Sequence, residues 1–105
     1  MAVKQQFTSF EEAIANSEQP ILVDFYATWC GPCQIMSKIL EEVNIQLNGQ
    51  MKILKIDTDS YPHIASQHQI QSLPTLVLFK DGRAVDRMEG VVPTPRLLDR
   101  IAQFL

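Results

Sequence analysis

The chain has 105 residues, of which 46% are hydrophobic and 20% are charged, a balance typical of a folded domain with one core rather than of a disordered segment. Its formal net charge of −3 offers no basic surface to nucleic acid. No apolar run approaches the roughly 20 residues of a membrane-spanning helix, and the opening MAVKQ has neither a signal-peptide nor a transit-peptide pattern. We therefore expect a single domain over residues 1–105, with no nucleic-acid or membrane partner.

The N-terminal segment predicts a short strand and then a helix. Residues 3–7 can form the strand, and Ser9 with Glu12 makes a capping box at the start of the helix. Three apolar residues at helical spacing are expected to bury one face of that helix: Phe10, Ala13 and Ile14.

The next segment predicts a buried strand that leads into a long helix. Residues 21–27 are apolar on both faces apart from Asp24 and a tyrosine hydroxyl, which is typical of a strand with helices on both sides of its sheet. Over residues 35–47 apolar side chains repeat every three or four positions, which predicts a helix. Asn48-Gly49 supplies the left-handed residue that ends it.

A third strand and a short helix follow. Residues 51–56 predict the strand, and Asp59 is the expected N-cap of a helix that runs through Ala65. The two histidines of the chain, His63 and His68, are interpreted as surface residues of this helical region.

The C-terminal third predicts a hairpin and a last helix. Strands over residues 75–79 and 83–89 flank Asp81-Gly82, a two-residue hairpin signal. Thr94 is the expected N-cap of the final helix. This order of strands and helices predicts a three-layer α/β domain with a mixed sheet.

The chemistry of the chain is concentrated in Cys30 and Cys33, its only cysteines, which flank Gly31-Pro32. A Cys-x-x-Cys pair between a strand and a helix is typical of a redox dithiol. Cys30 is expected at the helix N-terminus, where free N–H groups and the helix dipole favour the thiolate. Cys33 lies one turn further on, close enough for a disulfide. The pattern predicts a site that forms and breaks S–S bonds.

Two other uses of the cysteine pair are weaker. A purely structural disulfide would close a loop of only four residues and would gain little, because the entropy of loop closure grows with loop length. A metal site needs more ligands, yet there is no second Cys-x-x-Cys, and the histidines at 63 and 68 do not share a helix face. We therefore expect no metal.

Asp24 is the unusual charge, because it interrupts an apolar strand just before the dithiol. Burial would raise the pKa of its carboxyl by desolvation. A carboxyl that titrates near neutral pH below the dithiol could accept the proton of Cys33 when that thiol becomes a nucleophile. The alternative is a solvated aspartate at a strand edge, without a catalytic role.

Five short motifs are distributed along the chain: VDFYATWCGPC (23–33), KID (55–57), LPT (73–75), LFKDG (78–82) and EG (89–90). In sequence and spacing they resemble the thioredoxin family, and residues 26–28, Gln34 and 55–62 are similar to the y-type thioredoxins of plastids and cyanobacteria. The resemblance implies a thioredoxin fold, with a central five-stranded mixed sheet in the order 1-3-2-4-5, four helices and a cis peptide bond before Pro74.

The resemblance also implies roles for individual residues. Cys30 would attack a substrate disulfide and Cys33 would release the reduced product, while Gly31 and Pro32 would set a reducing potential. Lys55, from sequence alone an ordinary exposed lysine, is the implied partner of Asp24 on the neighbouring strand. Five residues are expected at the rim of a groove that holds an extended peptide: Trp29, Thr58, Leu73, Pro74 and Gly90.

Two positions depart from the commonest family pattern. Lys38 stands where most members have a proline that bends the long helix, so this helix is expected to be straighter. Gln34 stands where many members have a basic residue, which should slightly weaken stabilisation of the thiolate.

The resulting hypothesis is a monomeric general protein-disulfide reductase that uses a reversible Cys30–Cys33 disulfide and no bound cofactor. The resemblance implies electrons from an NADPH- or ferredoxin-dependent thioredoxin reductase, and the y-type likeness adds peroxiredoxins and methionine sulfoxide reductases as targets. The expected location is the cytoplasm, or alternatively the plastid stroma. Two rival hypotheses are a disulfide oxidant or isomerase, and a partner-binding module of the same fold in which the dithiol is incidental.

Overall fold

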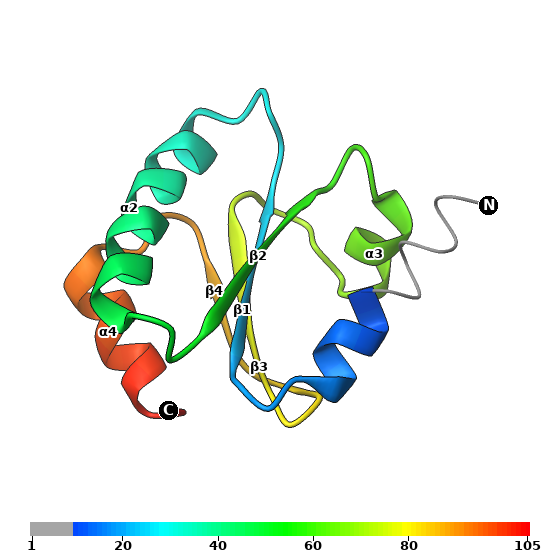
Figure 1. Cartoon of the computed structure of the whole chain (residues 1–105). Helices are drawn as coiled ribbons and strands as arrows, with labels where there is room; N and C mark the ends of the chain where they lie inside the picture. The colour runs from blue at the N-terminus through cyan, green and yellow to red at the C-terminus, as the bar shows by residue number, and fades with distance from the viewer. Residues whose placement is uncertain (1–9) are drawn as a thin grey trace.

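The computed structural model describes residues 10–105, in which a sheet lies between two groups of helices (Figure 1). On one side lie α2 (Gly31–Leu47) and α4 (Thr94–Ala102). On the other side lie α3 (Pro62–Gln67) and a helix that includes residues 10–16. The expected strand over residues 3–7 and the Ser9 cap lie outside the described residues. The three-layer α/β architecture is confirmed.

The sheet is mixed and has four strands within the described residues: β1 (Ile21–Tyr26), β2 (Lys52–Asp57), β3 (Thr75–Lys80) and β4 (Arg83–Glu89). Their order is β2-β1-β3-β4, with β1 parallel to β2 and antiparallel to β3, and β3 antiparallel to β4. If the expected N-terminal strand is counted first, these four strands have the order 3-2-4-5 that the resemblance implies. Because β1 lies between β2 and β3, the chain that follows β1 begins at the middle of one end of the sheet.

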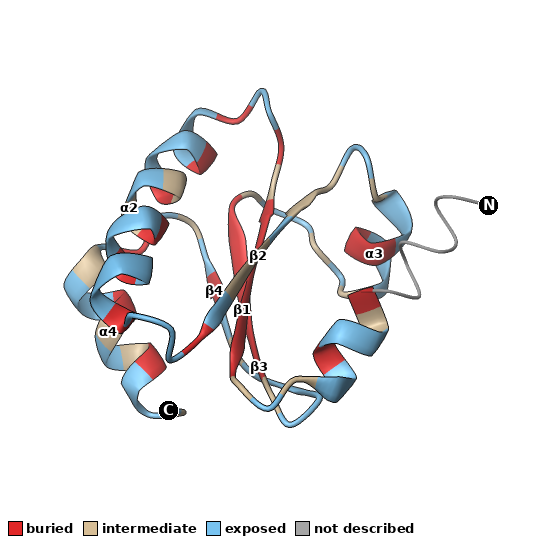
Figure 2. Cartoon of the chain, in the orientation of Figure 1, coloured by how far each residue is buried: buried red, intermediate tan, exposed pale blue. Residues whose placement is uncertain are grey.

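Both faces of β1 are buried, as its apolar sequence predicts (Figure 2). Leu22 belongs to a core cluster with Met36 and Leu40 of α2. Val23 and Phe25 point to the opposite face and join the cluster that includes residues of α3 and of the helix over residues 10–16. Because side chains alternate along a strand, Asp24 lies on the same face as Leu22, beneath α2.

The expected turns are confirmed. Asn48 ends α2 in the left-handed conformation with φ of 46°. Asp81 and Gly82 connect β3 to β4 with φ values of 54° and 78°, the positive angles that a tight hairpin turn requires.

Two expected helix caps are wrong. The N-cap of α3 is Tyr61 rather than Asp59, and the N-cap of α4 is Pro93 rather than Thr94, which is the first residue of that helix. Both helices carry a proline in their first turn, where a fixed φ and a missing N–H group suit a helix start without a side-chain cap. The carboxylate of Asp59 instead accepts a hydrogen bond from the Trp29 indole.

The interpretation of the two histidines as surface residues is confirmed for His63, which is exposed, and wrong for His68. The His68 ring lies between Phe10, Phe25 and Phe79, with ring centroids 5.6, 5.8 and 5.5 Å away. Its side chain is 19% exposed, and its Nε2 atom lies 3.5 Å from a Glu11 carboxylate oxygen. His68 follows the last residue of α3 and turns inward, which helical periodicity does not predict.

Candidate active site

The two cysteines form a disulfide at the N-terminus of α2. Their Cα atoms are 5.2 Å apart, and Cys30 is the N-cap residue of the helix. The Cys30 Sγ accepts a hydrogen bond from the amide of Cys33 at 3.2 Å, and the Cys30 amide donates to the carbonyl of Ala27 at 3.3 Å. The first turn of α2 carries no acidic residue that would offset the positive end of the helix dipole. The structure therefore has the backbone environment that favours a thiolate at Cys30 after reduction.

Exposure of the dithiol is low in this oxidised form. Cys30 is 6% exposed and Cys33 is 4% exposed, so the two residues differ little in exposure to solvent. The two residues form a small cluster with Ala27, against which Tyr26 and Leu73 also pack. The disulfide is therefore covered in part by the residues that surround it.

Trp29 is the most prominent feature of that rim, with 72% of its surface exposed. Its indole Nε1 donates a hydrogen bond of 2.8 Å to the Asp59 carboxylate. Asp59 lies in the turn after β2, where its amide donates to the Asp57 side chain at 3.0 Å. The indole is thus held to a second loop and remains open to solvent.

Asp24 is completely buried below the dithiol helix, which confirms its expected burial. Loss of solvation raises the pKa of its carboxyl from 3.8 to about 6, and the nearby positive charge of Lys55 opposes that rise. Both carboxylate oxygens are buried without a hydrogen-bond partner in the described part of the chain. Burial therefore holds the pKa of this carboxyl well above the ordinary value of an aspartate.

Lys55 lies directly opposite Asp24 in the register of β1 and β2. Its ammonium group nevertheless donates a 2.7 Å hydrogen bond to the Ser37 hydroxyl of α2 and lies 5.0 Å from the centre of the Tyr26 ring. Within residues 10–105 it forms no ion pair of 4.0 Å or less with Asp24. The implied pairing is present in the strand register, whereas the ammonium group bonds to a residue that the sequence reasoning missed.

The other expected rim residues come from three loops. The Leu73–Pro74 bond is cis, as the resemblance implies, and the Pro74 carbonyl accepts the Gly90 amide at 2.9 Å. Gly90 has a φ of 85° and open space where a side chain would project. The Thr58 amide and hydroxyl both donate to the Tyr26 carbonyl, at 2.9 and 3.2 Å. Thr58 therefore fixes the end of β1 against the end of β2.

Leu73 is the rim residue with unused backbone groups. In the loop before β3, neither its amide nor its carbonyl has a hydrogen-bond partner among the described residues. The leucine side chain packs on the cysteine cluster, so these groups lie beside the disulfide. An unpaired amide and carbonyl next to an apolar side chain suit strand-like pairing with a peptide.

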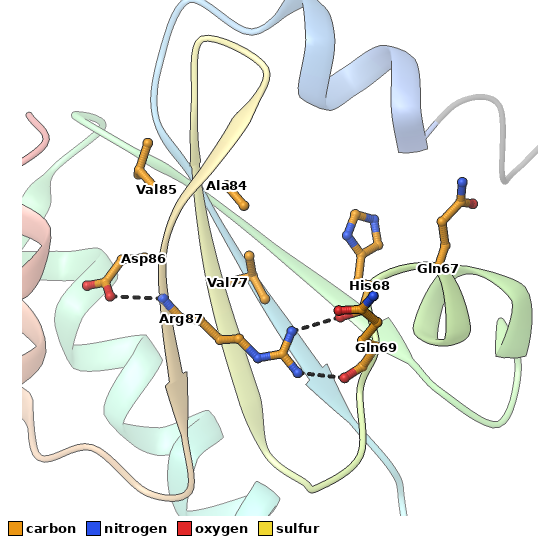
Figure 3. A pocket seen from close by; sticks show the side chains of 8 residues that line it. All are labelled: Gln67, His68, Gln69, Val77, Ala84, Val85, Asp86 and Arg87. Carbon is orange, nitrogen blue, oxygen red and sulfur yellow. Dashed lines mark hydrogen bonds between the residues drawn. The ribbon is translucent and has the colours of Figure 1, made fainter.

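A hollow lies away from the dithiol, between the end of α3 and the edge strand β4 (Figure 3). It has a volume of about 430 Å³ and shares no residue with the dithiol site. The Arg87 guanidinium closes one side by donating hydrogen bonds of 2.7 Å each to the carbonyls of His68 and Gln69. Gln69 has a φ of 56°, and Arg87 supports this turn by satisfying two of its carbonyls.

No helix within residues 10–105 is long and apolar enough to cross a membrane. No cluster of three or more histidine, cysteine, aspartate or glutamate side chains with the geometry of a metal site occurs in this part of the chain.

Comparison with known proteins gives relatives that span the whole chain. A thioredoxin-like protein of Synechocystis is 59% identical over 105 residues, which are 100% of both chains. The chloroplastic thioredoxin Y2 of Arabidopsis thaliana is 52% identical over 99% of this chain, which spans 62% of that relative's length. A crystal structure of chloroplastic thioredoxin z matches with a TM-score of 0.84 at 36% identity, over 92% of this chain and 88% of that one.

These relatives agree with the y-type likeness of the motifs, and the family profile described as Thioredoxin matches residues 1–103. Thioredoxins are disulfide oxidoreductases, and the Cys30–Cys33 disulfide at the start of α2 has the arrangement that this chemistry needs. The chain belongs to the thioredoxin family.

Proposed function

We propose that this protein is a general reductant of protein disulfides, which transfers two electrons from a thioredoxin reductase to target proteins. The observation that carries the proposal is the position of Cys30, whose sulfur accepts a hydrogen bond from a backbone amide at the N-terminus of α2. A helix N-terminus lowers the pKa of a cysteine thiol, and the thiolate is the attacking species in disulfide exchange. The Gly31-Pro32 dipeptide supports a reducing role, because the resemblance links it to reductants.

The reaction proceeds in two exchanges. The reduced Cys30 thiolate attacks one sulfur of the target disulfide, forms a mixed disulfide and displaces the other target sulfur as a thiolate, which takes up a proton. Cys33 then loses its proton and attacks Cys30 Sγ. The second target sulfur leaves as a thiol, and the Cys30–Cys33 disulfide of the structure is formed. The target gains two electrons, and the dithiol loses them.

Asp24 is the proposed base of the second exchange. Its carboxyl is buried on the face of the sheet that α2 covers, and its pKa of about 6 means that it is mostly ionised at neutral pH and can accept the proton of Cys33. Lys55, opposite it on β2, is the proposed partner that limits the cost of that charge.

The proposed target-binding surface is the rim of the dithiol. Trp29 would provide an apolar shelf, and the free backbone groups of Leu73 would pair with an extended peptide. Gly90 would let the peptide backbone approach, because among residues 10–105 nothing beyond its chain neighbours lies within 4 Å of the position that a Cβ atom would take. Pro74 and Thr58 would hold these loops in place. This backbone-centred recognition suits targets of varied sequence.

The proposed electron donor is an NADPH- or ferredoxin-dependent thioredoxin reductase, and the proposed targets are the peroxiredoxins and methionine sulfoxide reductases that the y-type likeness implies. We propose that the protein acts as a monomer with one domain over residues 1–105. Its proposed location is the cytoplasm or the plastid stroma, the second supported by the chloroplastic relatives.

Insulin reduction with NADPH-dependent and ferredoxin-dependent donors tests this function. The wild-type protein is expected to reduce insulin catalytically with at least one donor system, and Cys30→Ser is expected to be inactive. The reduction potential is expected near that of reducing thioredoxins, about −270 mV. A potential near that of strong oxidants, about −120 mV, would favour the oxidant hypothesis instead. A biological role that survives Cys30→Ser would favour the partner-binding hypothesis.

A further inference from the structure

The ammonium group of Lys55 is held by two contacts, neither of them with the carboxyl opposite it. It donates to the Ser37 hydroxyl at 2.7 Å and lies over the Tyr26 ring at 5.0 Å. A cation over an aromatic face and a hydrogen bond to a hydroxyl both fix its direction. The Asp24 oxygens meanwhile have no hydrogen-bond partner among the described residues. A lysine opposite a buried carboxylate would otherwise be expected to bond with it.

We propose that Ser37 is a positioning residue of the active site: its hydroxyl holds the Lys55 ammonium away from Asp24, so that the buried carboxyl keeps its affinity for a proton. This inference rests on the proposed role of Asp24 as the base for Cys33. Ser37 lies one helical turn after Cys33 on α2, so the same face of the helix carries the second sulfur and the anchor of the lysine.

Within residues 10–105, Lys55 is the charged group whose electrostatic effect on the Asp24 carboxyl is resolved. In the register, β3 places the apolar Leu76 opposite Asp24, on the side away from Lys55. From α2, Glu41 is the titratable group that lines the same hollow as Ser37 and Lys55. Cys33, also on α2, does not titrate while it is in the disulfide. A contact with a cation lowers the pKa of a carboxyl, and a cation held at a distance lowers it less. The hydroxyl of Ser37 thus decides how much of the lysine charge reaches the base.

The ammonium has room to move. Ser37, Lys55 and Glu41 line a hollow of about 320 Å³ between α2 and β2. Lysine side chains reorient readily because several single bonds join the ammonium to the backbone. When the hydrogen bond that Lys55 donates to Ser37 is lost, the ammonium is expected to turn toward the Asp24 carboxylate on the paired strand.

The test is a titration of the Asp24 carboxyl carbon by NMR in the oxidised, isotopically labelled protein. Ser37→Ala is expected to lower the titration midpoint of Asp24 by about one pH unit. Ser37→Thr keeps a hydroxyl and is expected to keep the wild-type midpoint. Asn44→Ala is the matched control, because Asn44 lines the same hollow on the same helix, whereas the Lys55 ammonium donates its hydrogen bond to Ser37. It is also expected to leave the midpoint unchanged.

The decisive comparison adds Lys55→Met. This variant alone is expected to raise the midpoint, and in its background Ser37→Ala is expected to have no further effect, because Ser37 acts only through the lysine. A midpoint that Ser37→Ala leaves unchanged or raises would overturn the proposal, as would a shift that persists without the lysine. The titration uses oxidised protein and no reductase or target. Failure here therefore leaves the proposed function standing, and failure of insulin reduction leaves this result standing.

Discussion

Asp24 and Lys55 face each other across β1 and β2, and yet the carboxyl and the ammonium do not form an ion pair. The carboxyl lies at zero exposure with both oxygens unpartnered within residues 10–105. A charged group without partners in such a place weakens the fold. Two consequences can be measured, one in stability and one in catalysis.

Replacement of Asp24 by asparagine is expected to stabilise the oxidised protein at neutral pH. Folding raises the pKa of this carboxyl from 3.8 to about 6, so between these values the folded state binds more protons than the unfolded state, and stability falls as pH rises. The full penalty, about 3 kcal/mol, applies above pH 6. Urea unfolding of wild type and Asp24→Asn from pH 4 to pH 8 should show a difference that grows up to about pH 6–7 and is constant above it.

The exposed Asp99→Asn variant is the control for that experiment, since it removes a carboxylate from the surface. It should follow the wild-type pH dependence. A loss of stability at pH 7 in Asp24→Asn would mean that the carboxylate supports the fold. Asp24→Asn should also reduce insulin more slowly than the wild-type protein near neutral pH, because Cys33 has then lost the base of the second exchange.

Cys33→Ser is expected to accumulate mixed disulfides between Cys30 and target proteins. The serine hydroxyl that replaces the Cys33 thiol cannot attack the mixed disulfide, so the reaction stops after the first exchange. Non-reducing electrophoresis followed by mass spectrometry would identify the captured partners. The Cys30→Ser variant should capture none. If the two variants captured equal amounts, the roles assigned to the two sulfurs would be wrong.

Loss of the Trp29–Asp59 hydrogen bond is expected to loosen the rim without unfolding the protein. Asp59→Ala removes the acceptor at 2.8 Å, and Asp59→Asn keeps one. Asp59→Ala should increase the mobility of the Trp29 indole, which is measured as lower fluorescence anisotropy. It should also weaken productive target binding by about 0.5–1.5 kcal/mol. Ser60→Ala, at the exposed next position, is the control. An indole signal that Asp59→Ala does not change would contradict this account of the rim.

His68→Ala is expected to lower the free energy of unfolding by about 1–3 kcal/mol, because the ring fills a space between three phenylalanines. His68→Phe restores an aromatic ring and should lose less. His63→Ala alters an exposed histidine and should change stability by no more than about 0.5 kcal/mol. Urea unfolding followed by circular dichroism gives the comparison. Equal losses in His68→Ala and His63→Ala would exclude a packing role for the His68 ring.

The parts of this structure that the sequence predicts well are those set by near neighbours. The apolar run of β1, the left-handed Asn48, the Asp81-Gly82 turn and the dithiol at a helix start all follow from residues a few positions apart. Burial of Asp24 follows from its apolar flanks in the same way. Local patterns are sufficient here because backbone conformation and the alternation of side chains are local properties.

What the sequence did not predict depends on contacts between distant segments. Asp59 has the side chain of a helix cap, but a tryptophan thirty residues earlier uses its carboxylate. His68 belongs to a helical stretch, but its ring turns inward among aromatic side chains from three other segments. Ser37 is recognisable only after folding brings β2 under α2, although its place one turn after Cys33 was a usable signal.

The hydrogen bond from the Cys33 amide to the sulfur of Cys30 means that the reactive atom of this protein is also a structural atom of its longest helix. An alanine at position 30 would remove the reactive sulfur and also leave the Cys33 amide without an acceptor. Loss of activity in that variant could then come either from the missing thiol or from a disordered first turn of α2. Serine keeps an acceptor at the same point, and it is among the residues preferred there. Inactivity of the serine variant can therefore be attributed to the missing sulfur.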